Sequence, residues 1–145
     1  MHEVIFEEAI EKIRAKDPRY HRDAYHFVRE ALDQTKKSMG KKSDDPVLHV
    51  TGQELLEGIR ELALKQFGPM TLMLFEEWGI KSCQDFGEVV FNMVDIGLLA
   101  KTKTDSRADF QNGFDFQTAF RQPFLPSSSQ TMAPPQEASE APTSN

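Results

Sequence analysis

The chain has few of the features that mark secreted, membrane or redox proteins. Among its 145 residues it holds one cysteine, Cys83, which excludes an intramolecular disulfide and is typical of a reducing compartment. No apolar run approaches the roughly 18 residues that a membrane helix needs. The first residues, 1–17, are interrupted by acidic groups and do not have the apolar centre of a signal peptide. We therefore expect a cytoplasmic protein that does not enter a membrane.

An excess of positive charge is also missing. The chain contains 17 Lys and Arg against 23 Asp and Glu, which gives a net charge of −6. Because sequence-independent binding to nucleic acids comes mainly from cations that neutralise phosphates, this balance disfavours a nucleic-acid partner. Phosphate-binding glycine loops, the GxSxG pattern and metal-binding spacings such as CxxC and HExxH are absent too. We expect no enzyme activity, no cofactor and no metal.

Helical periodicity, in contrast, extends over most of the chain. Apolar residues recur at helical spacing in five segments, and the expected helices cover residues 3–16, 18–38, 52–67, 70–78 and 83–96. Thr51 and Glu54 form a capping box at the start of the third helix, and Ser82 caps the fifth. Asp17 is expected to cap the second helix, with Pro18 at its first position.

The periodicity changes after Gly97. The stretches LLAKT and FDF are typical of short strands, and Asn112-Gly113 between ADFQ and FDFQ predicts a β-hairpin. From residue 123 onward Pro, Ser, Thr, Ala, Gln and Glu dominate, which predicts a disordered tail over 123–145.

The order of elements over residues 51–120 resembles a winged helix-turn-helix domain. The residues that carry this resemblance are Gly79-Ile80, Ser82, Val90, Gly97-Leu98-Leu99, Lys101 and the stretch DSRADF. In that family the third helix reads the major groove and the hairpin contacts the DNA backbone and minor groove. The resemblance predicts a mainly α fold. We expect a helical hairpin over 1–38 to pack on a winged-helix-like core over 51–120, which ends in a short β-hairpin. Both are expected to belong to one domain over 1–122.

The region 1–124 also resembles a family of short hypothetical proteins restricted to planctomycetes and verrucomicrobia. The matching stretches are DPRYHRDAYHFVREAL, HVTGQELLEGIRELALKQFGPM, EEWGI, DFGEVVFNMV and GLLAKTKTDSRADF. This second resemblance implies no activity, cofactor or catalytic residue.

The outer face of the fifth helix decides between two functions. With Phe86 facing inward, a rotation of about 100° per residue defines that face. It carries Gln84, Asp85, Glu88, Asn92 and Asp95, with Phe91 on its flank. Each carboxylate pressed toward a phosphate costs on the order of 1 kcal/mol. The predicted hairpin adds a net charge of only +1, so the face expected to meet DNA is acidic.

We therefore expect a small non-catalytic adaptor or regulatory module that binds a protein partner, and the sequence leaves its identity and the oligomeric state open. The candidate contact residues are Arg22, His26, Arg29, Gln84, Glu88, Phe91, Asn92, Lys101, Lys103 and Arg107. The alternative is a sequence-specific DNA-binding regulator of the winged-helix type. In that case Gln84 and Asn92 contact bases, and the three cations of the hairpin contact phosphates.

Two further features have a structural and a functional interpretation. The fourth helix is apolar on more than one face, through Met70, Met73, Phe75 and Trp78, which indicates either burial or a surface for a partner. Phe91 and Phe110 are candidates for exposed aromatic side chains. Cys83 begins a helix, where the helix dipole favours a thiolate; otherwise it is an ordinary half-buried cysteine.

Overall fold

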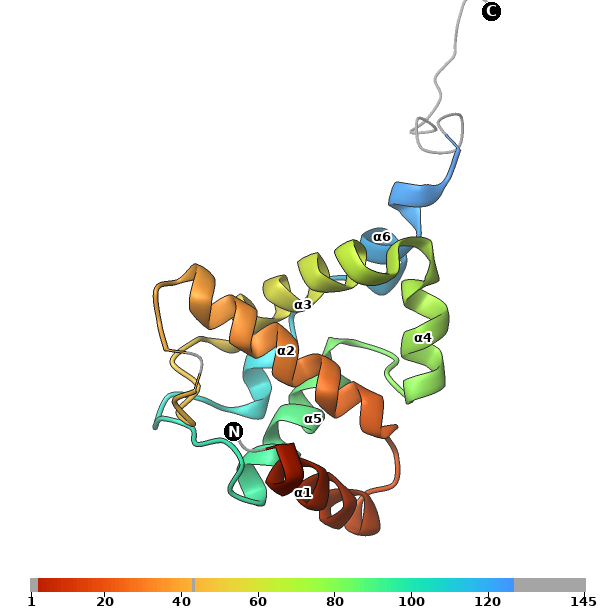
Figure 1. The fold of residues 1–145 in the computed structure, drawn as a ribbon. Helices are drawn as coiled ribbons and strands as arrows, with labels where there is room; N and C mark the ends of the chain where they lie inside the picture. Colours follow the sequence, from red (N-terminus) through yellow and green to blue (C-terminus); the bar gives the residue numbers. More distant parts are fainter. Residues whose placement is uncertain (1–2, 43, 127–145) are drawn as a thin grey trace, which may run out of the picture.

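The computed structural model describes residues 3–42 and 44–126, and the part of the predicted tail from residue 127 on lies outside them (Figure 1). The α-helices of these residues are α1 (Glu3–Lys16), α2 (Arg22–Ser38), α3 (Gly52–Phe67), α4 (Thr71–Trp78), α5 (Cys83–Asp95) and α6 (Phe116–Phe120). The same residues form the 3-10 helices η1 (Gly68–Met70), η2 (Arg107–Phe110) and η3 (Gln122–Phe124), of which η3 follows α6. The prediction of a mainly α fold is confirmed. None of the helices described is long and apolar enough to cross a membrane.

The predicted caps of α3 and α5 are both present. The amide of Glu54 donates to Thr51 Oγ1 over 3.0 Å, and the amide of Thr51 donates back to the Glu54 carboxylate over 2.8 Å. Ser82 and Asp85 form the same reciprocal arrangement at the start of α5. These boxes satisfy amides that have no partner within the helix, which explains why the sequence placed both starts correctly.

The start of α2 was predicted wrongly. The helix begins at Arg22, and His21 caps it by accepting a hydrogen bond from the amide of Asp23 over 3.0 Å. Asp17, the expected cap, instead accepts hydrogen bonds from the amide and the guanidinium of Arg19. Its carboxylate is used in the turn between α1 and α2 and does not reach the start of α2.

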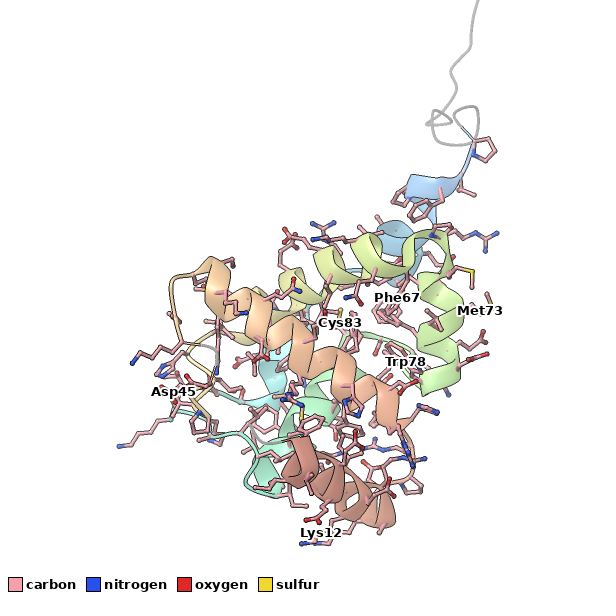
Figure 2. All side chains as sticks on the ribbon, in the orientation of Figure 1. Lys12, Asp45, Phe67, Met73, Trp78 and Cys83 are labelled. Atoms are coloured by element: carbon pink, nitrogen blue, oxygen red, sulfur yellow. The ribbon has the colours of Figure 1, made fainter. Side chains whose placement is uncertain are left out.

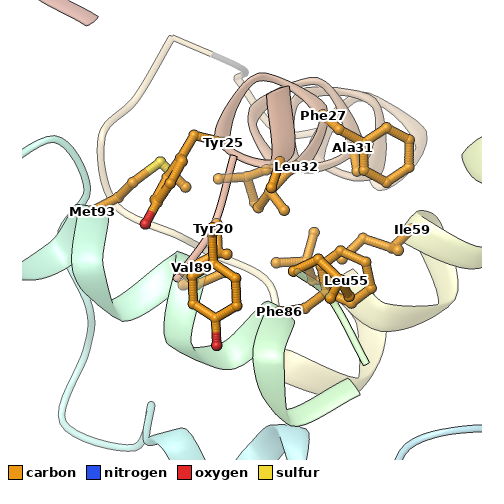
Figure 3. Packing of buried hydrophobic residues seen from close by; sticks show 14 of the residues in the cluster. Tyr20, Tyr25, Phe27, Ala31, Leu32, Leu55, Ile59, Phe86, Val89 and Met93 are labelled. Atoms are coloured by element: carbon orange, nitrogen blue, oxygen red, sulfur yellow. The ribbon is translucent and has the colours of Figure 1, made fainter. Parts of the chain in front are cut away.

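The core is built around α2. Figure 3 shows Phe27 and Leu32 of α2 with Leu55 and Ile59 of α3 and with Phe86 of α5. All of these side chains are buried.

An aromatic cluster extends the core toward α4 and α6. The ring of Phe75 in α4 lies with its centroid 5.2–5.8 Å from the centroids of Phe27, Trp78, Phe86 and Phe120. Aromatic pairs at this spacing contribute about 0.5–1.5 kcal/mol each beyond the area they bury. This cluster therefore fastens α4 and α6 to the rest of the domain.

The predicted C-terminal hairpin is not present in residues 97–126. Val47 and Ala100 form one isolated parallel bridge, and the remainder of this region contains η2, α6 and η3. Asp115 caps α6 by accepting from the amide of Thr118 over 3.0 Å. Phe116 and Phe120 are one helical turn apart, and both rings contact Phe75. The alternation in FDF suggested a strand, but the pair of phenylalanines spaced by four residues packs as a helix.

The hairpin signal at Asn112-Gly113 has a different physical cause. A Cβ atom on Gly113 would lie 2.5 Å from Cys83 Sγ and 2.7 Å from Cys83 Cβ. Glycine is needed here for close approach to α5, whereas in a hairpin it would supply the turn geometry. The first residues of the predicted tail also have structure, because η3 includes residues 123 and 124.

Candidate interaction surfaces

The outer face of α5 carries a network of ion pairs. Glu88 pairs with Arg19, from the turn before α2, over 3.2 Å and with Arg107 of η2 over 3.2 Å. Arg107 also lies 3.5 Å from the carboxylate of Asp95. No cation of α5 itself lies beside Glu88 and Asp95; the guanidinium groups that pair with them come from other elements, which the helical projection does not contain.

The carboxylate of Asp85 is hydrogen-bonded within the chain. Its carboxylate accepts a hydrogen bond from the hydroxyl of Tyr20 over 2.5 Å and from the amide of Lys81 over 2.8 Å. Burial of Tyr20, together with this acidic neighbour, raises the pKa of the phenol. Asp85 therefore joins the turn before α2 to α5, and the phenol stays protonated as the donor.

Asn92 is likewise occupied within the chain. Its side-chain amide donates to the Asp17 carboxylate over 3.0 Å and to the Tyr25 hydroxyl over 3.1 Å. The Arg19 guanidinium, and to a smaller extent Asn92, lower the pKa of Asp17 well below its usual range. An asparagine committed to these two partners is not available to read an adenine edge.

The network leaves the outer face of α5 acidic. Its charged members are Asp17, Arg19, Asp85, Glu88, Asp95 and Arg107. Four carboxylates meet two guanidinium groups, so the net charge of the face is −2. Sequence reasoning missed Asp17, Arg19 and Tyr20, because they lie 65 to 75 positions from their partners in α5 and no periodic signal links them.

Phe91 and Phe110 were expected as exposed aromatic side chains, and this expectation is wrong. Phe91 is 4% exposed and Phe110 is 3% exposed. The guanidinium of Arg107 covers the ring of Phe91, with 5.0 Å between Cζ and the ring centroid. Within the set predicted on the outer face of α5, Gln84 and Asp95 are exposed, whereas Asp85, Glu88 and Asn92 are half-buried.

The predicted stripe on α2 faces α1. Arg22 pairs with Glu11 over 2.9 Å, and His26 pairs with Glu7 over 2.8 Å. The guanidinium of Arg29 lies over the ring of Phe6, 4.5 Å from its centroid. These contacts fasten α1 to α2, which gives all three side chains a structural role.

The loop between α5 and η2 places the remaining predicted cations in solvent. Lys101 and Lys103 are both exposed. Asp105 orders this loop by accepting hydrogen bonds from the amide and the hydroxyl of Thr102, over 2.8 and 3.1 Å. Thus the structure brings Arg107 onto α5 and leaves the two lysines on the surface.

The outer side of α4 carries apolar side chains in solvent. Met70, which precedes α4, is 49% exposed, and Met73 is 50% exposed. Glu76 and Glu77 are exposed on the same short helix. Figure 2 shows Trp78 on the inner side of α4 and Met73 on its outer side. The two interpretations of this helix therefore apply to different faces: one is buried and the other is open.

Cys83 does not have the properties of a reactive thiol. It is 4% exposed, and its Sγ donates to the carbonyl of Phe114 over 3.4 Å. Burial raises the pKa of the thiol to about 11, which outweighs the effect of the helix start. Among residues 3–42 and 44–126, no group of three His, Cys, Asp or Glu side chains is arranged to hold a metal ion.

Comparisons of the chain with protein-family models, with curated proteins and with solved structures gave no match.

Proposed function

We propose that this chain is a non-catalytic protein-interaction module whose docking surface is the outer side of α4. The observation that carries this proposal is the exposure of Met70 and Met73, at about half of each side chain. The same segment also buries apolar side chains, Phe75 and Trp78, on its inner side. Exposed apolar side chains that adjoin one another are typical of a surface that a partner covers.

The chemistry of this surface defines the partner. Methionine side chains are flexible and polarisable, so they adapt to apolar surfaces of different shapes. Covering the exposed half of each methionine is worth about 1 kcal/mol. Glu76 and Glu77 add two negative charges to this surface. An amphipathic segment with an apolar face and basic flanks fits both features.

Several side chains that the sequence proposed as contacts are satisfied within the chain. Arg22, His26 and Glu88 have ion-pair partners at 2.8 to 3.2 Å, and Asn92 has two hydrogen-bond partners. A partner that used these groups would first have to displace those contacts. A partner that covers the thioether side chains of Met70 and Met73 displaces no ion pair of these two residues. This difference supports the outer side of α4 as the docking surface.

A pair of matched substitutions tests the proposal. Replacing Met70 and Met73 together by lysine removes the apolar surface. The new ammonium group at position 73 would lie one helical turn from the carboxylate of Glu77, and such a pair of opposite charges stabilises a helix. Met39→Lys is the control, because Met39 is an exposed methionine at the end of α2. Affinity capture from the native cell, read by mass spectrometry, should lose a partner with the double variant and keep it with the control. Identical partner sets would contradict the proposal.

The same proposal places α3, α4 and α5 as the helices of a winged-helix-like core, in which η2 and α6 stand where a hairpin was expected. A cytoplasmic location is part of the proposal and depends on the single cysteine. Binding to DNA is disfavoured by the net charge of −2 on the outer face of α5. Oligonucleotide binding that falls steeply with salt, and that Lys101→Glu with Lys103→Glu abolishes, would favour the DNA alternative instead.

A further inference from the structure

A cavity of about 380 Å³ opens between α1, α2, the loop at 44–46 and the end of α5. Its volume falls within the range of roughly 300–1,000 Å³ that is common for small-molecule sites. The apolar part of its wall comes from Phe6, Leu32, Met93, Leu98 and Leu99. The wall also contains charged side chains from α2 and from the loop. An apolar cavity with a small number of polar groups is the usual form of a site for a small organic molecule.

The lysine of this cavity is buried and hydrogen-bonded within the chain. Lys36 is 1% exposed, and its Nζ donates to the carbonyl of Asp45 over 2.6 Å. The other cation of the wall, Arg29, lies over the ring of Phe6. Both positive groups therefore already contact the protein: the ammonium of Lys36 is bound to a backbone carbonyl, and the guanidinium of Arg29 lies over an aromatic ring.

The carboxylates of the wall are open to a ligand. Asp33 is half-buried and Asp44 is exposed. Among the described residues, none makes a hydrogen bond or ion pair with the carboxylate of Asp33; burial raises its pKa, and the nearby charges of Arg29 and Lys36 offset part of that rise. Asp45 adds a third carboxylate, which accepts from the amide of Val47 and contacts His49. Three carboxylates therefore line the cavity against two occupied cations.

We propose that this cavity binds a small organic cation, an alkylammonium or arylalkylammonium compound. Its ammonium group lies against the carboxylate of Asp33, and its apolar body lies against Phe6, Leu32 and Leu98. A cationic group here gives the Asp33 carboxylate a direct ion pair, which none of the described residues makes with it. The site is separate from the docking surface on α4, so each stands without the other.

Three six-carbon probes test this assignment by their charge. Hexylammonium, 1-hexanol and hexanoate are titrated into the full chain, and the methyl resonances of Met93, Leu98 and Leu99 are followed by NMR. We expect saturable shifts with hexylammonium, binding at least tenfold weaker with 1-hexanol, and no saturable binding with hexanoate. Equal or tighter binding of hexanoate would overturn the proposal and assign the site to Lys36, and the absence of saturable binding by hexylammonium would overturn it as well.

Two matched variants identify the anchoring group. Asp33→Asn keeps the shape of the side chain and removes its charge, so hexylammonium affinity should fall at least tenfold while 1-hexanol affinity is unchanged. Glu8→Gln is the control, because Glu8 is exposed on α1 and is not part of the cavity wall. If Asp33→Asn and Glu8→Gln reduce hexylammonium affinity by the same factor, the effect is one of overall charge and the proposal fails. Thermal unfolding of each variant checks that the fold is retained.

Discussion

Replacing Gly87 of α5 by alanine tests whether η2 lies directly on this helix. A Cβ atom at position 87 would lie 2.9 Å from Cβ and Cγ of Phe110 and 3.0 Å from its Cδ1. Because Phe110 is 3% exposed, its ring has no free space into which it can move. Overpacking of this kind costs about 1–3 kcal/mol, and exchanging glycine for alanine inside a helix returns about 1 kcal/mol. We expect the free energy of unfolding to fall by up to about 2 kcal/mol.

A second background separates the steric effect from the helical one. With Phe110→Gly already present, Cβ and the ring atoms are gone, so Gly87→Ala should be neutral or stabilise the chain by up to about 1 kcal/mol. Urea unfolding followed by circular dichroism gives the midpoint and slope for all four proteins of the cycle. Stabilisation of equal size in both backgrounds would mean that Phe110 does not press on Gly87, and the packing described for η2 would be refuted.

Three other measurements test local features of the fold. Cys83 should react with iodoacetamide about 100-fold more slowly than an unshifted cysteine at the same pH, because raising its thiol pKa to about 11 lowers the thiolate fraction; a rate equal to that of a free thiol would contradict its burial. Thr51→Ala should lower the free energy of unfolding by about 1 kcal/mol through loss of the capping box with Glu54, and Thr51→Ser should recover most of it. The pKa of Asp17 is lowered in the folded chain, so its stabilising effect is complete above the unfolded pKa and is lost as the pH falls toward the folded one. The difference in stability between the wild type and Asp17→Asn should therefore shrink from about pH 7 to about pH 3, and a constant difference would contradict the pairing with Arg19.

Local signals predicted the helices well where the cause was itself local. The box of Thr51 and Glu54 lies within four residues, and so does that of Ser82 and Asp85, so both starts could be placed from the sequence. The start of α2 was misplaced because Asp17 had two local uses, as a cap and as a partner of Arg19. Sequence spacing alone does not rank these uses, because the energies of one cap and one exposed ion pair are similar.

The C-terminal region shows the opposite case. Asn112-Gly113 is a strong hairpin signal in isolation, but the side chain of Cys83, about 30 residues away, decides which residue fits at position 113. Phe116 and Phe120 gain contact with Phe75 only when the chain turns into α6. Tertiary packing therefore overrides the local preference at this point, and no window of the sequence contains that information.

The acidic face of α5 illustrates why a site is harder to predict than a helix. A helical projection correctly placed Glu88 and Asp95 away from Phe86, because that follows from the helix alone. It said nothing of Arg19 and Arg107, which come from other elements and pair with these carboxylates. The charge that a partner meets is set by the pairing as well as by the residues. Pairing removes part of the repulsion that a polyanion would meet and leaves two carboxylates in excess, so this face still disfavours DNA. The exposed side chains of Met70 and Met73, which have apolar surface to cover, therefore favour a protein partner more directly than α5 does.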